Sequence, residues 1–530
     1  MILQWIHSLN NIFYGTIPLF VLINFILLIV CICLNLNYLK KFFKEISLRT
    51  WLLLLFIFLG ALMLRIFFVS HCHIMYIDEW WYMKAGKDML LDGSQYAYSK
   101  SIGWPFILTI VFGMFRISNW VALYTSSVLG ALTIFNIFFL SFLISKNRNL
   151  SLISSTLFCL IPFHIRWSGT AETNVPSLFF ITLTLFFCFL YYRKKKNSLL
   201  WLSLISLAFT AQFRPENYIF PLLFFLGFFI FKIDILKKLN LKFILPWILL
   251  IILSFANLFQ VLDFHLSTNW IENDTRGMQT GNNWSLSNLI NNSIQYGIDF
   301  FKNEYHPFLY SILFVLGAGF MFFKNRRNFY FLAIWFSALY FIYFTSWFQT
   351  LGGSSRFFLS FYPITVIFAG YGLFFIYRIL FLKFNLKSAR VGIIFLSIIL
   401  FLSFIPSIDS CLNIYSNPAL KLETEIPELA EREIPSDCII VANFPEILES
   451  TTDLNVVNIN LFFKNKKYSQ ELFDKSSCVL FFEDYYCFDR DAFDSKEKCK
   501  MMHANYKLTQ YLTFSKEQKT YTFYRVFQRE

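Results

Sequence analysis

The sequence predicts a mostly α-helical, polytopic membrane protein with about twelve spans and a small C-terminal α/β domain. Hydrophobic residues make up 57% of the 530 residues and charged residues only 15%, whereas soluble domains average roughly 25% charged residues. Long apolar runs recur from residue 13 to residue 407, and the composition then changes to short apolar stretches separated by dense charge. The chain is therefore expected to have a membrane part followed by a soluble part.

Runs of about 18–20 apolar residues, enough as helices to cross a hydrocarbon core about 30 Å thick, recur along the chain and locate the predicted spans. The spans are expected near residues 13–38, 51–70, 120–143, 150–167, 174–192, 198–213, 217–232, 242–260, 308–323, 329–347, 357–378 and 391–407. No basic residue precedes the first run and "KKFFK" follows it, so we expect an uncleaved span whose N-terminal end lies outside.

Short basic clusters separate these runs and explain the net charge of +13 as a topology signal rather than a nucleic-acid surface. They lie at residues 39–49, 146–149, 193–197, 232–242, 324–328 and 378–390. The positive-inside rule places all of them in the cytoplasm. The alternate segments are then expected on the non-cytoplasmic face: residues 71–119, 168–173, 214–216, 261–307, 348–356 and the tail from about 408.

The tail reads as a domain of its own. Four short apolar stretches, at residues 438–443, 454–462, 477–484 and 519–527, predict strands, and residues 421–434 predict a helix before them. We therefore divide the chain into an extra N-terminal span with a cytoplasmic loop (1–50), a transmembrane domain (51–407) and a non-cytoplasmic α/β domain (408–530).

The ten cysteines offer one candidate disulfide and no metal site. Cys487 and Cys499 lie in a polar segment on the predicted oxidising side, so they are either paired with each other or free. His71, Cys72 and His73 are consecutive, and three adjacent residues cannot supply ordinary tetrahedral ligand spacing. Neither a metal nor another cofactor is expected.

Charged side chains next to spans are costly and rarely idle, so those at the predicted outer ends are candidate site residues. They are Asp78, Glu79 and Lys84 in the first outer segment, Arg166 and Glu172 at the second, Arg214 and Glu216 at the third, and Arg356 at the last. Since all lie on one predicted face, they are expected to converge there.

Acids and bases that meet at an outer membrane face suit a reaction between a lipid-held phosphate and an outer substrate. If a sugar leaves a polyprenyl phosphate, the departing anion needs positive charge nearby, which Arg356, Arg214, Arg166 and Lys84 can supply. The acceptor must lose a proton, which calls for a carboxylate partly shielded from water. Asp78 fits that role, and the neighbouring Trp80 and Trp81 form a candidate substrate platform.

Structural interpretations stay open for the same residues. The Asp78–Glu79 pair can cap a juxtamembrane helix, Arg214 and Glu216 can form a local ion pair, and Arg356 or Lys84 can extend to the headgroups. The tryptophans are typical of an interfacial belt. For the whole chain, the alternatives are a transporter or lipid flippase, which places ionisable residues near the bilayer midplane, and a scaffold whose tail binds a partner.

Five segments, in this order and on this common side, resemble the GT-C membrane glycosyltransferases that use lipid-phosphate sugars, in the branch of the protein O-mannosyltransferases and the lipid A aminoarabinose transferases. They are "YIDEWWYMKAGKDML" (76–90), "KSIGWPFILTIVFGMF" (100–115), "IPFHIRWSGTAETNVPSLFF" (161–180), "QFRPENYIFPL" (212–222) and "GGSSRFFLSFYPITVIFAGYGL" (352–373). The second segment looks like the juxtamembrane helix of that family. The resemblance covers about residues 50–407; the extra span at 13–38 and the tail depart from it.

The resemblance implies an inverting, single-displacement sugar transfer on the non-cytoplasmic face. By position, Asp78 corresponds to the base with Glu79 as its neighbour, Glu172 to the second-loop acidic residue, and Arg356 to the phosphate partner. The expected partners are a polyprenyl-phosphate-linked sugar, an acceptor protein, lipid or glycan, and the bilayer, with no nucleic acid. The chain is expected to be a multi-pass integral membrane protein with its active site and tail on the non-cytoplasmic face.

Overall fold

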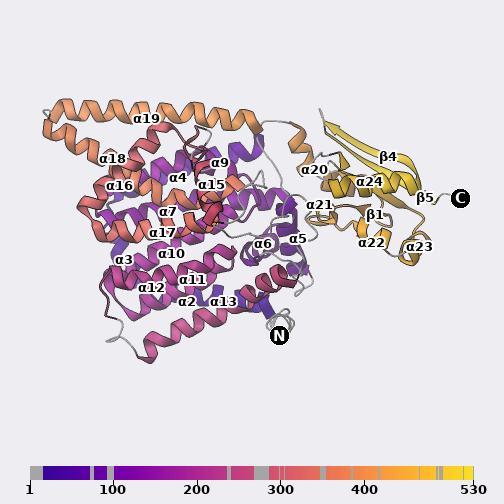
Figure 1. The fold of residues 1–530 in the computed structure, drawn as a ribbon, viewed down its shortest axis with the longest axis horizontal. Helices are drawn as coiled ribbons and strands as arrows, with labels where there is room; N and C mark the ends of the chain where they lie inside the picture. The colour runs from indigo at the N-terminus through magenta and orange to yellow at the C-terminus, as the bar shows by residue number, and fades with distance from the viewer. Residues whose placement is uncertain are drawn as a thin grey trace.

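The computed structural model describes residues 16–71, 77–91, 101–234, 240–267, 286–295, 297, 299–303, 305–345, 354–383, 386–415, 418–464, 466–484, 487–488, 493–516 and 519–528. The helices gather in one body, and the strands lie at the opposite end of the molecule with the C-terminus (Figure 1). The predicted class, a helical membrane part with a small α/β domain, is confirmed.

A helix or helix pair forms at every predicted span. They are α2 (Ile17–Leu34), α4 (Leu48–His71), α7 (Asn119–Ser145), α8 (Arg148–Leu160) with α9 (Pro162–Ser168), α10 (Asn174–Lys194), α11 (Asn197–Ala211), η2 (Pro215–Ile219) with α12 (Phe220–Ile230), α13 (Leu241–Ser267), α16 (Phe308–Lys324), α17 (Arg326–Thr345), α18 (Tyr362–Lys383) and α19 (Leu386–Tyr415). Helices suit these sequences because lipid offers no hydrogen bonds, and a helix satisfies its backbone internally.

Length and composition divide these helices into two groups. Within the described residues, six helices are long and apolar enough to cross a membrane by themselves, and the bent pair α8–α9 makes a seventh candidate. The other predicted spans coincide with apolar helical stretches of 10–17 residues, among them residues 241–255 of α13 and 394–410 of α19. The bend of 61° between α8 and α9 follows from Pro162, which begins α9 and cannot continue the hydrogen-bond ladder of α8.

The remaining helices of the membrane part connect or flank the spans. They are α3 (Leu36–Lys44), α5 (Ile77–Leu91), α6 (Gly103–Met114), α15 (Leu286–Gln295), η4 (Asp299–Phe301) and η5 (Ser354–Phe361). The first basic cluster was expected in a connecting loop, but its first half forms α3. This short helix is amphipathic and buries Leu39 and Phe42 on one face. The segment that resembles a juxtamembrane helix forms α6.

Close helix contacts in the bundle depend on glycine. A Cβ atom on Gly317 of α16 would lie 1.6 Å from the carbonyl oxygen of Phe368 in α18, and one on Gly372 would lie 2.0 Å from the carbonyl oxygen of Leu313. Small residues allow backbones to approach in this way in membrane bundles, where helices gain stability from packing rather than from leaving water.

The tail folds around one five-stranded sheet in the order β2-β1-β3-β5-β4. The strands are β1 (Ile439–Ala442), β2 (Asn455–Asn458), β3 (Val479–Glu483), β4 (Tyr506–Lys516) and β5 (Lys519–Gln528); the helices are α20 (Pro418–Glu433), α21 (Pro445–Glu449), α22 (Ile459–Lys464), α23 (Lys466–Lys475) and α24 (Phe493–Asn505). β1 pairs in parallel with β2 and β3, whereas β5 is antiparallel to β3 and β4.

Three details of the tail differ from the prediction. The stretch 454–462 is a strand only to Asn458 and continues as α22, the edge strand β4 was not predicted, and α19 runs through Pro406 to Tyr415. The domain boundary after residue 407 thus falls inside a continuous helix, which extends toward α20 along one side of the molecule (Figure 1).

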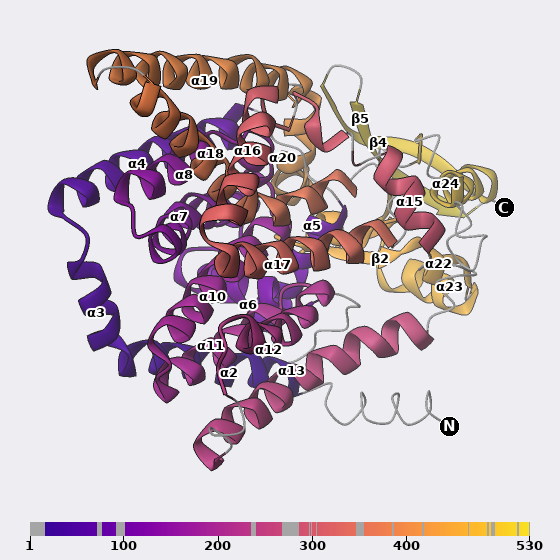
Figure 2. The same cartoon turned by 60° about the vertical axis from the view of Figure 1, so that its left-hand side comes forward.

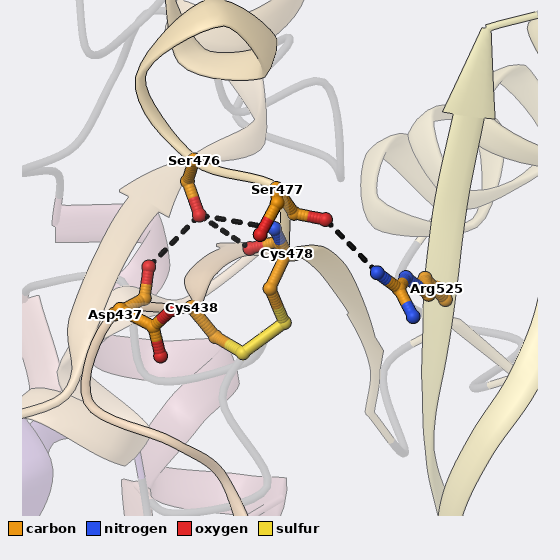
Figure 3. Close-up of a disulfide and its surroundings, with 6 residues drawn as sticks. All are labelled: Asp437, Cys438, Ser476, Ser477, Cys478 and Arg525. Atoms are coloured by element: carbon orange, nitrogen blue, oxygen red, sulfur yellow. Dashed lines mark hydrogen bonds between the residues drawn. A yellow bond between two sulfur atoms is a disulfide. The ribbon is translucent and has the colours of Figure 1, made fainter.

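Two disulfides lie in the tail. Cys487 is bonded to Cys499, so of the two states that the sequence left open the structure has the disulfide. The second disulfide, Cys438–Cys478, was not predicted; it joins the residues that immediately precede the parallel strands β1 and β3 (Figure 3). Beside it, the Ser476 hydroxyl donates to the Asp437 carbonyl at 2.8 Å, and Arg525 of β5 donates to the Ser477 carbonyl at 3.0 Å.

Candidate active site

Arg356 joins two of the predicted carboxylates at one end of the bundle. It lies in η5, at the end of the predicted outer segment 348–356, and its Nη1 lies 2.6 Å from Glu172 Oε1, while its Nη2 lies 3.3 Å from Asp78 Oδ2. The two carboxylates differ in burial, because the Glu172 side chain is 2% exposed and that of Asp78 is 28% exposed. Glu172 therefore anchors Arg356, and Asp78 is the carboxylate that a substrate can reach.

Arg214 supplies a second guanidinium next to the first. Its side chain forms an ion pair with Glu216 and donates to Asn174 Oδ1 at the start of α10. The guanidinium carbons of Arg214 and Arg356 lie 5.1 and 5.7 Å from the centre of the Phe357 ring. Although burial opposes the charge on Arg214, the Glu216 carboxylate outweighs it and holds the pKa of Arg214 above its ordinary value.

Hydrogen bonds hold the predicted outer segments against one another. The Glu79 carboxylate, which is fully buried, accepts the backbone N–H of Ala171 at 2.6 Å. The backbone N–H of Gly103 donates to the Gln212 carbonyl at 2.7 Å, and the Thr173 hydroxyl donates to the Phe213 carbonyl at 3.1 Å. Hydrogen bonds between residues up to 109 positions apart, Gly103 and Gln212, thus join these segments into one frame around Arg356.

Glu79 and Asp78 therefore do different things although they are adjacent. Successive residues of a helix point about 100° apart, so on α5 Asp78 turns to Arg356 while Glu79 turns to the loop before α10. Because Glu79 is buried and holds a backbone N–H, its geometry fits a structural anchor rather than a second catalytic carboxylate.

Lys84 and Trp81 contact the tail rather than the Arg356 cluster. The Lys84 ammonium lies 3.1 Å from Asp88 and 3.3 Å from Glu449 of α21. Burial opposes its charge, but those two carboxylates hold the pKa of Lys84 above its ordinary value. Trp81 lies against the Glu446 carboxylate, also on α21. The structure thus gives Lys84 a docking contact in place of the predicted phosphate contact.

Two more predicted residues lie apart from the cluster. Trp80 is 1% exposed and belongs to the hydrophobic core, so its ring is not presented as an open platform. Arg166, near the end of α9, is half-buried and lies over the Trp167 ring at 5.5 Å. Cys72 and His73 lie outside the described residues, as does the side chain of His71. Within the described part, no group of three or more His, Cys, Asp or Glu side chains could hold a metal ion.

The cluster contains residues that were not predicted. Tyr82 follows Asp78 by four residues and shares its helix face. Burial and the carboxylates of Glu172 and Asp78 hold the pKa of Tyr82 well above its ordinary value, so the phenol stays protonated. Tyr343 of α17 donates to Glu216 at 3.0 Å. The i, i+4 spacing after Asp78 could have pointed to Tyr82, whereas Tyr343 carries no signal in an aromatic-rich sequence.

Two buried N–H groups of the cluster have no hydrogen-bond partner among the described residues. They are Nε of Arg356 and Nδ2 of Asn174. Buried donors are almost always satisfied in folded proteins, so unsatisfied donors beside two guanidinium groups mark a place suited to an anion. Together with the accessible Asp78, the cluster can hold an anionic group and accept a proton next to it.

Comparison of the whole structure with solved structures identifies its fold. No family model matches the sequence, and no curated protein matches it. Among solved structures, the Archaeoglobus fulgidus oligosaccharyltransferase complexed with zinc and sulfate has 12% identity and a TM-score of 0.55, covering 89% of this chain and 72% of its own. ArnT from Cupriavidus metallidurans bound to undecaprenyl phosphate has 10% identity and a TM-score of 0.54, covering 90% and 98%.

The chain has the GT-C fold. A further structure with this fold is the archaeal oligosaccharyltransferase AglB with an inhibitory peptide and a dolichol-phosphate; its identity is 12% and its TM-score 0.52, covering 90% of this chain and 74% of its own. In this chain, the carboxylates of Asp78 and Glu172 both form ion pairs with the Arg356 guanidinium. They do not fit a metal such as the zinc of the first structure, and no step through a metal follows.

Proposed function

We propose that this chain transfers a sugar from a polyprenyl-phosphate donor to an acceptor on the non-cytoplasmic face, in a single displacement that inverts the anomeric centre. The observation that carries the proposal is a cluster of two guanidinium groups, Arg356 and Arg214, with the Asn174 amide. These groups can bind an anion, and the accessible carboxylate of Asp78 lies beside them. The GT-C fold supports a membrane glycosyltransferase, and solved structures with this fold hold undecaprenyl phosphate or dolichol-phosphate.

The donor phosphate is proposed to sit between the two guanidinium groups and to take up the free N–H donors of Arg356 and Asn174. Arg356 Nη1 forms an ion pair with the buried Glu172, so the remaining N–H groups of Arg356 can donate to the phosphate while this ion pair is kept. The Asp78 contact to Arg356 is longer and more exposed. A bound phosphate therefore competes with the Asp78 carboxylate for the Arg356 guanidinium.

The proposed step balances as a simple displacement. A lone pair of the acceptor hydroxyl or amine forms a bond to the anomeric carbon, and the bond from that carbon to the phosphate oxygen breaks, leaving its electron pair on the phosphate. The acceptor proton passes to the Asp78 carboxylate as general base. Arg356 and Arg214 stabilise the negative charge that develops on the leaving phosphate, so no general acid is needed.

The other predicted residues take supporting roles in this proposal. Glu172 orients Arg356, Glu79 fixes α5 against the loop before α10, and the protonated Tyr82 can donate a hydrogen bond within the cluster. Arg166 and Lys84 are not assigned to the phosphate. The acceptor is a protein, a lipid or a glycan; related folds were solved with an acceptor peptide and with a polyprenyl phosphate.

The test measures transfer of labelled sugar from a panel of polyprenyl-phosphate donors to endogenous acceptors, in membranes that hold matched amounts of each form. Asp78→Asn is expected to abolish transfer while donor binding persists, and Arg356→Ala is expected to weaken donor binding. The control is Lys84→Gln, which changes a charge on the same helix and should leave transfer largely intact.

Outcomes of this comparison separate the proposed roles. Transfer that continues in Asp78→Asn but stops in Glu79→Gln would reassign the base to Glu79. Transfer that is untouched by Asp78→Asn, Glu79→Gln and Arg356→Ala would refute the proposed site as a whole. Movement of the polyprenyl-phosphate lipid across the bilayer without transfer of its sugar would instead support the flippase alternative.

A further inference from the structure

Arg65 is a buried cation inside an apolar span. It belongs to α4, whose residues 48–67 are apolar enough to cross a membrane, and its side chain is 0% exposed. Nη2 lies 2.7 Å from His164 Nδ1, Nε donates to the Ser168 hydroxyl at 3.2 Å, and Nη1 donates to the Ala61 carbonyl at 3.0 Å. These three partners are neutral, as is the Cys159 thiol that also interacts with the guanidinium, and among the described residues no carboxylate pairs with Arg65.

A charge in this position is costly and needs a reason. Ionisable residues inside spans are expensive, usually face the protein interior and usually mark function. Removing a buried charge from water is poorly repaid when the partners are dipoles rather than an opposite charge. A leucine or methionine would fill the same space without this cost, so packing alone does not explain Arg65.

The contacts of Arg65 fix the state of its partner. Arginine only donates hydrogen bonds, so His164 Nδ1 accepts and the histidine proton sits on Nε2. That Nε2 atom is buried and has no partner in the described part of the chain. The Ser168 hydroxyl donates to the His164 carbonyl at 2.7 Å and thus accepts from Arg65. His164 and Ser168 both belong to α9 and lie one turn apart, so Arg65 is hydrogen-bonded to both ends of that turn.

Helix α9 leads directly into the loop that holds the proposed site together. Three residues after Ser168, the Ala171 N–H anchors Glu79, and the next residue is Glu172, which anchors Arg356. The Ser168 carbonyl accepts from the Ser127 hydroxyl of α7 at 2.8 Å. The position of the loop is therefore tied to the position of α9.

We infer that Arg65 is a positioning residue for sugar transfer: through His164 and Ser168 it locks the bent helix α9, and with it the loop that places Glu172 and Glu79. This inference rests on the proposed function for its catalytic consequence, but the locking itself does not. Displacing catalytic groups by about 1 Å can cost on the order of a hundredfold in rate, so a loosened loop is enough to impair transfer.

The test combines a structural readout with an activity readout. Hydrogen exchange followed by mass spectrometry reports protection of residues 162–174 whether or not the donor is known. Arg65→Met keeps the length of the side chain but removes its charge and donors, whereas Arg65→Lys keeps the charge and a donor. The matched control is Asn328→Leu, which removes a buried side chain that donates to the Ile144 carbonyl and lies outside the site.

Arg65→Met is expected to raise exchange in residues 162–174 selectively and to lower transfer by about ten- to a hundredfold, and Arg65→Lys is expected to restore both in large part. Asn328→Leu is expected to change neither. Unchanged local exchange in a folded Arg65→Met protein overturns the inference, as does raised exchange with full transfer.

Two further results keep the inference separate from the rest. If Arg65→Met does not fold, Ser168→Ala removes one of the contacts and is judged by the same two readouts. If the unaltered chain shows no transfer with any donor, the proposed function fails, while the exchange data still decide whether Arg65 locks the loop.

Discussion

Arg356 is expected to be coupled much more strongly to Glu172 than to Asp78. Glu172 is 2% exposed and 2.6 Å away, so removing the cation deprives a buried carboxylate of this counter-charge, at a cost of about 3–5 kcal/mol. Asp78 is 28% exposed and 3.3 Å away, so solvent screens that contact and its share is about 1 kcal/mol or less.

Double-mutant cycles measure this difference directly. The variants are Arg356→Gln, Glu172→Gln and Asp78→Asn with the two double variants, and the quantity is the free energy of unfolding from denaturant titrations in detergent micelles. The coupling energy is expected to be about 2–3 kcal/mol for the Glu172 cycle and below about 1 kcal/mol for the Asp78 cycle. Equal couplings, or a larger one for Asp78, would refute the reasoning that burial sets the strength of these pairs.

Further predictions concern the packing and the tail. Replacing both Cys438 and Cys478 with serine opens a loop with a sequence separation of 40 and should cost the tail roughly 4 kcal/mol, seen as a lower unfolding temperature; a tail whose unfolding is indifferent to the change would contradict this. Gly317→Ala should destabilise the protein by about 1–3 kcal/mol because its Cβ meets the backbone of α18. Gly319→Ala, with no atom within 4 Å of the added Cβ, is its control. Burial raises the pKa of Glu446, so the folded protein binds this proton more tightly than the unfolded chain does. The stability of the fold should therefore fall as the pH rises from the ordinary glutamate range through the raised pKa. Glu446→Gln should remove that pH dependence of the unfolding temperature, and parallel pH curves for the two proteins would contradict it.

The membrane part was predictable because a bilayer demands long apolar helices, and the sequence shows their length and spacing directly. Local detail in the tail was less predictable. After β2, the Asn458 side chain accepts the N–H of Asn460 at 2.8 Å and starts a turn, so α22 replaces the second half of the predicted strand. In the edge strand β4, the half-buried residues Tyr506, Leu508, Leu512 and Phe514 alternate with polar residues, but a β-bulge between Gln510 and Leu512 interrupts the alternation by which a strand is recognised.

The site was predictable in part, for a related reason. Common sidedness was enough to bring Asp78, Glu172 and Arg356 together, since charges at the same ends of neighbouring spans have little room to diverge. It could not show that Lys84 pairs with Glu449, because that contact depends on how a separate domain docks. Arg65 was missed since one arginine in an apolar run has no neighbour in sequence to reveal its partners.

The stretch "IDEWWYMKAGKD" shows how one short helix serves three surfaces at once. With about 100° between residues, Asp78 and Tyr82 share the face toward Arg356, Glu79 faces the loop before α10, and Trp81 and Lys84 share the face toward α21 of the tail. The tail is therefore in contact with the same helix that carries the proposed base. Figure 1 shows α5 at the edge of the bundle beside α21, and Figure 2 shows the strands on the side of the molecule opposite α3 and α4. Lys87 of the same helix adds an ion pair with Asp453 at 2.8 Å, so several contacts dock the tail and the loss of Lys84 alone leaves α5 tied to it. A movement of the tail therefore acts on α5 through this set of contacts, and on Asp78 with it, although no one of them belongs to the cluster.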